Sequence, residues 1–228
     1  MSDYDALVGG GQSGLAAAHH LRARGLSPAI LKAGDEPVGS WPHNYDSLTL
    51  FSPAKYSSLP GLPFPGDPDR YPRRDDVVDY LRRYAKTIDT DIHVNHRVPT
   101  VDHDGRAFTA QTDTGTAFTA PRLIAATGGF GSPHLPDLAG RGTFTGKVQH
   151  ASDYRTPDDY AGQNVIVVRS GNSAVKIAAE LAEVADEVVL AIRSPVKFVP
   201  QRPWGARHAF LVHRHRHRPR RRPPSGTC

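Results

Sequence analysis

The fold is decided by residues 5–14, which read Asp5-Ala6-Leu7-Val8-Gly9-Gly10-Gly11-Gln12-Ser13-Gly14. Residues 5–8 have the pattern of a short buried strand, with the apolar residues at 6–8. The apolar spacing of residues 15–21 predicts a helix directly after the glycines, with Gly25 as its stop. A further apolar run at residues 29–31 predicts the next strand. This order of strand, glycine-rich turn, helix and strand predicts a βαβ unit.

Gly9, Gly11 and Gly14 have the spacing of a dinucleotide-binding turn. We expect Gly9 to permit the tight turn, Gly11 to let the backbone approach a pyrophosphate, and Gly14 to let helix and strand pack closely. Gln12 and Ser13 lie where the helix begins, and there the backbone N–H groups and the helix dipole attract an anion. The pattern therefore predicts a site for the pyrophosphate of a dinucleotide.

The end of the second predicted strand departs from this pattern. Such a site usually has Asp or Glu there, about 20 residues further on, to bind the ribose hydroxyls, but this chain has Lys32. Asp35 and Glu36 follow in the loop and are candidate substitutes. Lys32 also suits a phosphorylated ribose, which would make the first unit a site for NADP. The residues leave these alternatives open.

The rest of the first half predicts a loop, a helix and a group of short strands. The Pro and Gly content of residues 41–72 excludes a long helix, whereas residues 74–85 have a buried stripe and two Asp at their start. Residues 92–119 have the pattern of short strands joined by hairpin turns. Residues 123–126 predict another buried strand, which ends in Thr127-Gly128.

The βαβ pattern then recurs. Residues 165–168 predict a strand and residues 175–184 an amphipathic helix, with a turn between them that contains Gly171-Asn172-Ser173. Residues 188–192 predict the following strand. The chain therefore contains two nucleotide-type units.

Two arginines set the second unit apart. Arg169 stands where the spacing predicts the first glycine, and a side chain there disfavours the usual backbone geometry. Arg193 stands at the end of the second strand, where an acidic residue indicates NAD and a basic one NADP. The alternative interpretation of Arg193 is a solvated arginine after a strand.

With these units the chain resembles the flavin-dependent (class B) monooxygenases. It carries Phe144-x-Gly146-x-x-x-His150-x-x-x-Tyr154, which is similar to that family's signature and lies, as there, just before the second nucleotide fold. Gly39-Ser40-Trp41, residues 57–66 and Ala126-Thr127-Gly128 are also family-like. The resemblance covers residues 4 to about 204.

The resemblance implies an α/β fold with two Rossmann-like parts. Residues 1–154 would form the N-terminal part of a FAD-binding domain with a small β-meander, and residues 155–204 an incomplete NADP-binding domain. Family members use NADPH to reduce FAD, which then activates molecular oxygen to oxygenate a small organic substrate. The implied cofactor-binding residues are Gly9, Gly11, Gln12, Ser13, Gly14, Lys32, Gly39, Ser40, Trp41, Thr127 and Gly128 for FAD, and Gly171, Asn172, Ser173 and Arg193 for NADPH.

The chain also departs from the family. Lys32 replaces the acidic residue on the adenosine ribose, and Arg169 replaces a glycine. Phe51 aligns with an asparagine that some members place near the flavin. No catalytic acid–base pair is apparent, and His150 has a structural role in the favoured interpretation. These departures favour the alternative function, a non-catalytic module that binds FAD or another nucleotide.

Charge is concentrated in the last part of the chain. The net charge is +5, but residues 202–222 carry eight arginines and no acidic residue, so the remainder is close to neutral or slightly acidic. From residue 205 the apolar periodicity stops, and we expect a disordered basic tail over residues 205–228. Its abrupt composition, together with the greater length of family members, indicates the product of a reading-frame shift. The alternative is a natural basic tail.

The composition excludes several other classes. The tail lacks interleaved aromatic residues, so specific nucleic-acid binding is not expected. No apolar run is long enough to span a membrane, and no metal-ligand spacing is present. The single cysteine, Cys228, and the lack of a signal-type N-terminus predict a cytoplasmic protein. The oligomeric state is left open.

Overall fold

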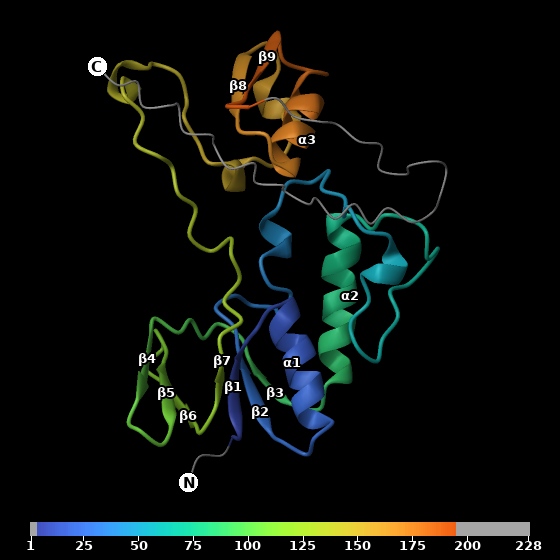
Figure 1. The fold of residues 1–228 in the computed structure, drawn as a ribbon, viewed down its shortest axis with the longest axis vertical. Helices are drawn as coiled ribbons and strands as arrows, with labels where there is room; N and C mark the ends of the chain where they lie inside the picture. The colour runs from blue at the N-terminus through green and yellow to red at the C-terminus, as the bar shows by residue number, and fades with distance from the viewer. Residues whose placement is uncertain (1–3, 195–228) are drawn as a thin grey trace, which may run out of the picture. The chain divides into compact units, whose positions relative to one another are not determined.

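The computed structural model describes residues 4–194, and its elements are labelled in Figure 1. The chain divides into two compact units, residues 1–196 and 197–228. Only the first unit contains described residues. The predicted tail at residues 205–228, with its disorder and its frame-shift origin, therefore lies outside the described residues.

The first βαβ unit is present as predicted. Strand β1 (Ala6–Gly9) leads into helix α1 (Gln12–Arg22), which returns the chain to β2 (Pro28–Leu31). These strands join β3 (Asp91–His93) and β7 (Leu123–Ile124) in a parallel sheet of order β3-β2-β1-β7. The carboxyl ends of β1 and β2 thus meet at one edge, where the glycine turn lies.

Both faces of this parallel sheet are covered. Helices α1 and α2 (Arg74–Thr87) lie side by side on one face, and a small antiparallel sheet covers the other (Figure 1). Side chains alternate between the faces: Ala6, Val8 and Ile30 pack toward the helices, whereas Leu7, Ala29 and Leu31 pack toward the small sheet. Burial on both faces explains why these strands are continuously apolar.

The small sheet is the predicted meander. It consists of β4 (Thr100–His103), β5 (Phe108–Gln111) and β6 (Ala117–Ala120) in antiparallel order. Its two hairpin turns contain Gly105 and Gly115 at φ 95° and 83°, conformations that favour glycine. One part of the prediction changes: β3, at the start of the predicted strand group, pairs with β2 instead of joining the meander.

Helix α2 anchors the long loop of residues 41–72 through hydrogen bonds to loop carbonyls. Its N-terminus is closed by the Asp76 carboxylate, which accepts a hydrogen bond from the Arg73 N–H at 2.8 Å. Buried Tyr80 and Tyr84 donate hydrogen bonds from the helix to the carbonyls of Leu62 and Pro60, at 2.7 and 2.8 Å. The loop itself contains only the short 3₁₀ helices η1 (Trp41–His43) and η2 (Ala54–Tyr56), as its Pro and Gly content predicted.

Two predicted elements need correction. The buried strand expected at residues 123–126 is only the partly buried pair of β7, because β7 is the edge strand of its sheet and has β1 as its single neighbour. The helix expected at residues 175–184 is α3 (Asn172–Leu181), which begins and ends three residues earlier. It begins earlier because the glycine turn is shorter than the composition indicated, with Gly171 as the N-cap.

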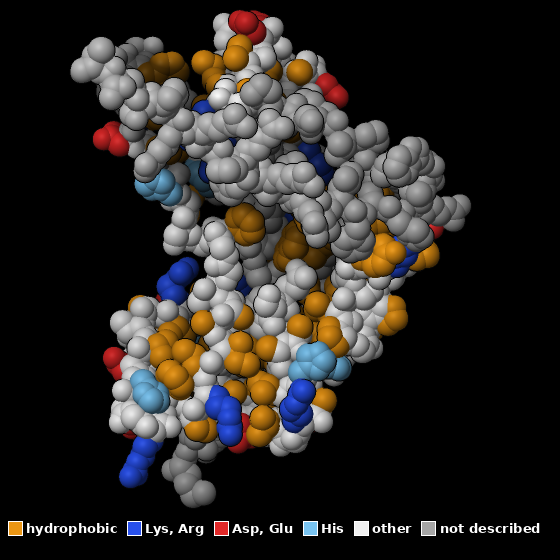
Figure 2. Space-filling model, in the orientation of Figure 1, with side chains coloured by type: hydrophobic (Ala, Val, Ile, Leu, Met, Phe, Trp, Pro, Cys, Tyr) orange, Lys and Arg blue, Asp and Glu red, His pale blue; other side chains and the backbone are white. Residues whose placement is uncertain are grey.

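The second βαβ unit consists of β8 (Asn164–Val168), α3 and β9 (Glu187–Ala191), with the two strands parallel. Before it come the short 3₁₀ helices η3 (Arg141–Thr143), η4 (Ala151–Asp153) and η5 (Pro157–Tyr160). Ile177 and Leu181 of α3 pack on Val165, Val167 and Val188. On the other face, Ile166, Val168 and Val189 are 67%, 63% and 45% exposed, and hydrophobic side chains reach the surface around β8 and β9 (Figure 2).

Candidate functional site

The first glycine turn is shaped by close contacts to backbone and side chains around it. A Cβ on Gly14 would lie 1.6 Å from the Gly9 carbonyl oxygen, so the predicted close packing of helix and strand is confirmed. A Cβ on Gly9 would lie 2.9 Å from the carbonyl oxygen of Ala126. Gly9 is therefore needed because the chain after β7 passes so close, which is a different reason from the tight turn that the sequence predicted.

Gly10, which the fingerprint does not include, is constrained as well. A Cβ there would lie 2.5 Å from the Cβ of Lys32. The sequence predictions did not include Gly10 or Ala126 among the site residues. The signals for them were the run of three glycines at residues 9–11 and the family-like motif at residues 126–128.

The N-terminus of α1 is open to an anion. Its N-cap is Gly11, which has no side chain to cap the first-turn N–H groups, and no acidic residue occupies that turn. The N–H groups at the start of a helix lack partners within it, and together with the helix dipole they attract a phosphate. Gln12 and Ser13, predicted for this role, are the first two residues of the helix. The glycine turn and this helix end fit the pyrophosphate of a dinucleotide.

Lys32 closes the far side of the turn. Its Nζ donates a hydrogen bond to the Gly39 carbonyl at 3.1 Å, and a Cβ on Gly39 would lie 3.6 Å from the Cα of Gly11. Burial lowers the pKa of Lys32, nearby Arg97 lowers it further, and Asp35 opposes the shift. The structure thus brings Gly11, Lys32 and Gly39 together, with an ammonium where a ribose-binding carboxylate would stand.

The two acidic residues after Lys32 differ in their contacts. Both oxygens of Glu36 accept hydrogen bonds from Nε of Arg82 at 2.9 Å, so Glu36 is engaged by helix α2. Asp35 acts on Lys32 only through its charge. Glu36 therefore does not replace the missing acidic residue in this conformation.

The remaining predicted residues of the first unit flank the turn. Gly39 adopts φ 66° and begins the turn into η1, where Ser40 is the N-cap and Trp41 packs against the main hydrophobic core. Thr127 and Gly128 are exposed, and Gly128 adopts φ 76° as the chain leaves the sheet. Phe51 is 73% exposed.

The second glycine turn is strained. Arg169 adopts φ 106°, a region that favours glycine, and holding an arginine there costs about 1–3 kcal/mol. Its N–H still donates to the Ala191 carbonyl at 3.0 Å, so the arginine stays in the strand ladder. The predicted conflict between a side chain and the turn geometry is therefore confirmed.

The rest of the second turn is open. Gly171 is the N-cap of α3 at φ −74°, no side chain caps the helix, and a Cβ on Gly171 would meet no atom within 4 Å. Asn172 and Ser173 are the first residues of α3, and Arg193 is exposed just after β9. The N–H groups at the start of α3 can bind a phosphate, as in the first turn. The two turns differ at their first position, where the second has the strained Arg169 and the first has Gly9.

A tyrosine cluster joins the loop after η1 to the second unit. Tyr45 packs against Tyr154 of the signature at 5.9 Å between ring centroids, and both are buried. Burial raises the pKa of Tyr45, while a hydrogen bond with Ser173 opposes the rise. Burial and then the Glu180 charge raise the pKa of Tyr154. Sequence reasoning missed Tyr45, whose only signal was its place after Gly39-Ser40-Trp41.

Polar contacts support the same junction. Ser47 Oγ donates to Glu180 Oε2 at 2.7 Å, and Lys176 Nζ donates to the Thr49 carbonyl at 2.8 Å. His150 Nδ1 accepts a hydrogen bond from the Ser152 N–H at 3.1 Å and caps η4. This contact supports the structural role that the sequence favoured for His150.

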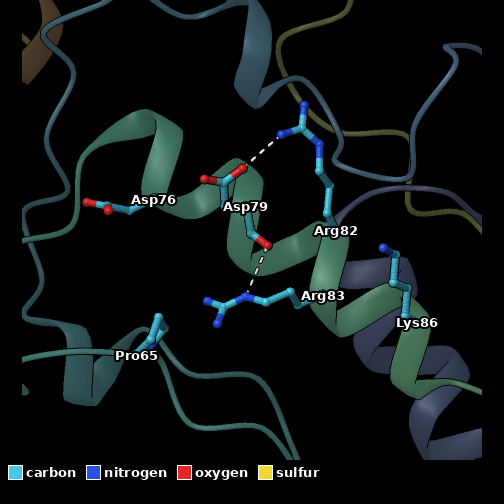
Figure 3. Close-up of a pocket in the computed structure, with 6 residues that line it drawn as sticks. All are labelled: Pro65, Asp76, Asp79, Arg82, Arg83 and Lys86. Atoms are coloured by element: carbon cyan, nitrogen blue, oxygen red, sulfur yellow. Dashed lines mark hydrogen bonds and ion pairs between the residues drawn. The ribbon is translucent and has the colours of Figure 1, made fainter.

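A surface pocket of about 420 Å³ lies elsewhere, along helix α2 (Figure 3). It is lined by Pro65, Asp76, Asp79, Arg82, Arg83 and Lys86. The charge of Arg82 is balanced by Asp79 and Glu36, each at 2.8 Å, and Arg83 Nε donates a hydrogen bond to the Asp79 carbonyl. This pocket is not formed by the predicted cofactor residues.

Residues 4–194 contain no helix that is both long and apolar enough to cross a membrane. In the same residues, no group of three or more His, Cys, Asp or Glu side chains could hold a metal ion.

Two glycine turns, each between a strand and a helix of a βαβ unit, are typical of oxidoreductases that bind two dinucleotides. The chain belongs to the pyridine nucleotide-disulphide oxidoreductase family, whose model matches residues 6–203. Its relatives include flavin-dependent monooxygenases, so the resemblance and the Rossmann-like fold predicted from the sequence are confirmed.

Three comparisons carry this assignment. The flavin-containing monooxygenase from Stenotrophomonas maltophilia is 37% identical with a TM-score of 0.83, over 88% of this chain and 61% of that one. Indole-3-pyruvate monooxygenase YUCCA1 of Oryza sativa subsp. japonica is 33% identical over 202 residues, 87% of this chain and 50% of the relative. A complex of OTEMO with FAD and NADP is 25% identical with a TM-score of 0.69, over 86% and 40% of the two chains. This chain spans about half the length of the curated relatives it matches.

Proposed function

We propose that this chain carries the FAD-binding and part of the NADPH-binding machinery of a flavin-dependent monooxygenase. The observation that carries the proposal is the first glycine turn, where Gly9, Gly10 and Gly14 leave no room for side chains and the N-terminus of α1 is uncapped. When bound, the two cofactors supply the redox chemistry, with electrons passing from NADPH through FAD to molecular oxygen.

In this proposal the amides of Gly11, Gln12 and Ser13 hold the pyrophosphate of FAD. The turn at Gly39-Ser40-Trp41 borders the same site, held there by the hydrogen bond from Lys32 to Gly39. Thr127 and Gly128 follow Ala126, whose carbonyl lies against Gly9. These residues bind and orient the cofactor, and no side chain among them transfers a proton.

The second nucleotide would lie on the α3 turn. Gly171, Asn172 and Ser173 supply amides for the NADPH pyrophosphate, and Arg193 supplies a cation for its phosphorylated ribose. Tyr45 and Tyr154 pack in one cluster with Ile177 and Leu181 of α3, the helix that begins at this turn. The domain boundaries that accompany this proposal are residues 1–154 for FAD and 155–204 for NADPH, and a cytoplasmic location remains a prediction.

The proposed substrate is a small organic molecule, oxygenated with molecular oxygen. The relatives named above include an indole-3-pyruvate monooxygenase, so indole-3-pyruvate is a reasonable first compound to test. The family name includes disulphide chemistry, but a dithiol centre cannot form within these 228 residues because they contain one cysteine.

A non-catalytic nucleotide-binding module is the second candidate. The observations that favour it are the strained Arg169 and the ammonium of Lys32 at the ribose end of the first turn. Two measurements separate the candidates. A visible absorption titration with FAD tests flavin binding, and NADPH oxidation with and without substrate tests turnover. Binding without NADPH oxidation would select the module, and no binding at all would contradict both.

A further inference from the structure

Arg169 is the most unusual backbone position among residues 4–194. Only two residues other than glycine have positive φ there, Asn95 at 56° and Arg169 at 106°. Asn tolerates this region because its short polar side chain can hydrogen-bond locally, whereas a bulky side chain does not. A glycine at residue 169 would relieve the strain. An arginine at this position therefore costs backbone strain that glycine would avoid. A functional contact of the arginine side chain would explain why the position is not glycine.

The fold places Arg169 and Arg193 at the same edge of the two-stranded sheet. Strands β8 and β9 are parallel and in register, with Val168 opposite Ala191. Arg169 follows Val168, and Arg193 comes two residues after Ala191, so both arginines stand at the same carboxyl edge as the N-terminus of α3. Both are exposed, and no carboxylate within the described range pairs with either guanidinium.

Two free guanidinium groups at one edge suit a ligand group with two negative charges. A phosphomonoester carries about −1.5 to −2 at neutral pH, and arginine binds phosphate through paired N–H donors. A ribose diol carries no charge and offers nothing comparable. The two forms of the nicotinamide dinucleotide differ by such a phosphomonoester, which NADPH has on its adenosine ribose and NADH lacks.

We propose that Arg169 is a specificity-determining residue, which binds the phosphomonoester of NADPH together with Arg193. The inference rests on the proposed function, because it assumes that the α3 turn holds the nicotinamide dinucleotide. It reverses the simple interpretation of Arg169 as a glycine lost from the turn. In that interpretation the side chain only obstructs, and glycine would improve the binding of NADPH and NADH alike.

The test is direct binding of NADPH and of NADH to the full chain, followed by the fluorescence of the nicotinamide and without turnover. The variants are Arg169→Gly and Arg169→Lys. The matched control is Arg106→Gly, which removes an exposed arginine from the β4–β5 turn, remote in sequence from the α3 turn. Thermal unfolding of each variant shows whether it is folded.

We expect Arg169→Gly to weaken NADPH binding roughly 10-fold or more, the usual effect of losing a charge-assisted hydrogen bond. NADH binding should change less than about 3-fold, and the midpoint of thermal unfolding should stay or rise because the strain is gone. The NADPH affinity of Arg169→Lys should lie between those of the wild type and Arg169→Gly. Arg106→Gly should bind both nucleotides as the wild type does.

Two results would overturn the proposal. If Arg169→Gly binds NADPH as well as or better than the wild type, the arginine is an obstacle only. If both nucleotides weaken equally, Arg169 contributes no selectivity. Should the wild type bind neither nucleotide, the second nucleotide site of the proposed function is wrong, and this inference is overturned with it.

Discussion

The two βαβ units of this chain share the order strand, glycine turn, helix and strand, but they differ in how completely they are packed. In the first, a four-stranded parallel sheet is covered on both faces, and its turn is closed by Ala126 and Lys32. In the second, two strands are covered by α3 on one face, and the turn contains a strained arginine. The comparison teaches that the same local pattern forms in both, and that packing decides which turn is rigidly shaped.

The largest contrast should be in the strands themselves. Ile30 of β2 is fully buried, whereas Ile166 of β8 is 67% exposed. We expect Ile30→Ala to lower the free energy of unfolding by about 2–5 kcal/mol, because it leaves a cavity. Ile166→Ala should change it by less than about 0.5 kcal/mol. Urea unfolding of both variants provides the measurement, and equal losses would show that the exposed face of β8 is covered.

The next contrast concerns the glycine turns. In Gly14→Ala a methyl group would lie 1.6 Å from the Gly9 carbonyl, so α1 must move away from β1. We expect a loss of about 1–3 kcal/mol in stability, together with weaker FAD binding. Gly171→Ala is the matched control, since its Cβ meets open space and its φ is ordinary. Thermal unfolding that is unchanged in Gly14→Ala would contradict the close packing.

A smaller effect is expected at the ribose end of the first turn. Lys32→Glu restores an acceptor for the ribose hydroxyls, and a hydrogen bond to a charged group contributes about 1.5–3 kcal/mol. The substitution also removes the hydrogen bond to Gly39, which offsets part of the gain. We expect FAD to bind about 10-fold more tightly, as measured by absorbance titration. Lys32→Met removes the tether alone and should weaken binding, so equal affinities in all three proteins would show that Lys32 does not contact this site.

An effect confined to alkaline pH is the pH dependence of the first unit's stability. Burial raises the pKa of Tyr84 to about 12, while a tyrosine in the unfolded chain ionises near pH 10. Because the unfolded chain loses this proton first, the stabilisation present below pH 10 is lost progressively between about pH 10 and 12. Tyr84→Phe should flatten this part of the stability profile, although it also loses the hydrogen bond to Pro60.

The stability at alkaline pH can also be compared between the first and second units. The pKa of Tyr154 is also raised, first by burial and then by Glu180. If the two units unfold together, Tyr154→Phe should change the alkaline profile in the same direction. A profile that neither substitution alters would contradict the burial of both phenols.

Most of the first unit could be predicted because its signals are local. The apolar run before Gly9, the glycine spacing and the helix stop at Gly25 all agree, and the structure has β1 and α1 in those places. The hairpins at Gly105 and Gly115 follow from turn chemistry in the same way. The start of α3 was misplaced by three residues because the Gly171 turn resembles a longer loop in composition.

Contacts between distant segments could not be predicted. The pairing of β3 with β2, the Ala126 carbonyl against Gly9, and the packing of Tyr45 against Tyr154 each join segments that lie far apart in the sequence. Nothing local in the sequence reports them. The hydrogen bonds between Glu36 and Arg82 could not be predicted either, because they depend on where helix α2 packs.

The central claim is that the first glycine turn is shaped to hold the pyrophosphate of a dinucleotide, because Gly9, Gly10 and Gly14 leave no room for side chains and the N-terminus of α1 is uncapped. Its most direct test is a titration of the full chain with FAD, followed by visible absorption, for the wild type and for Gly14→Ala. The account predicts saturable binding near one FAD per chain in the wild type, with a flavin spectrum altered from that of free FAD, and a clear loss in Gly14→Ala. An unaltered flavin spectrum in the wild type, or equal binding by Gly14→Ala, would contradict it.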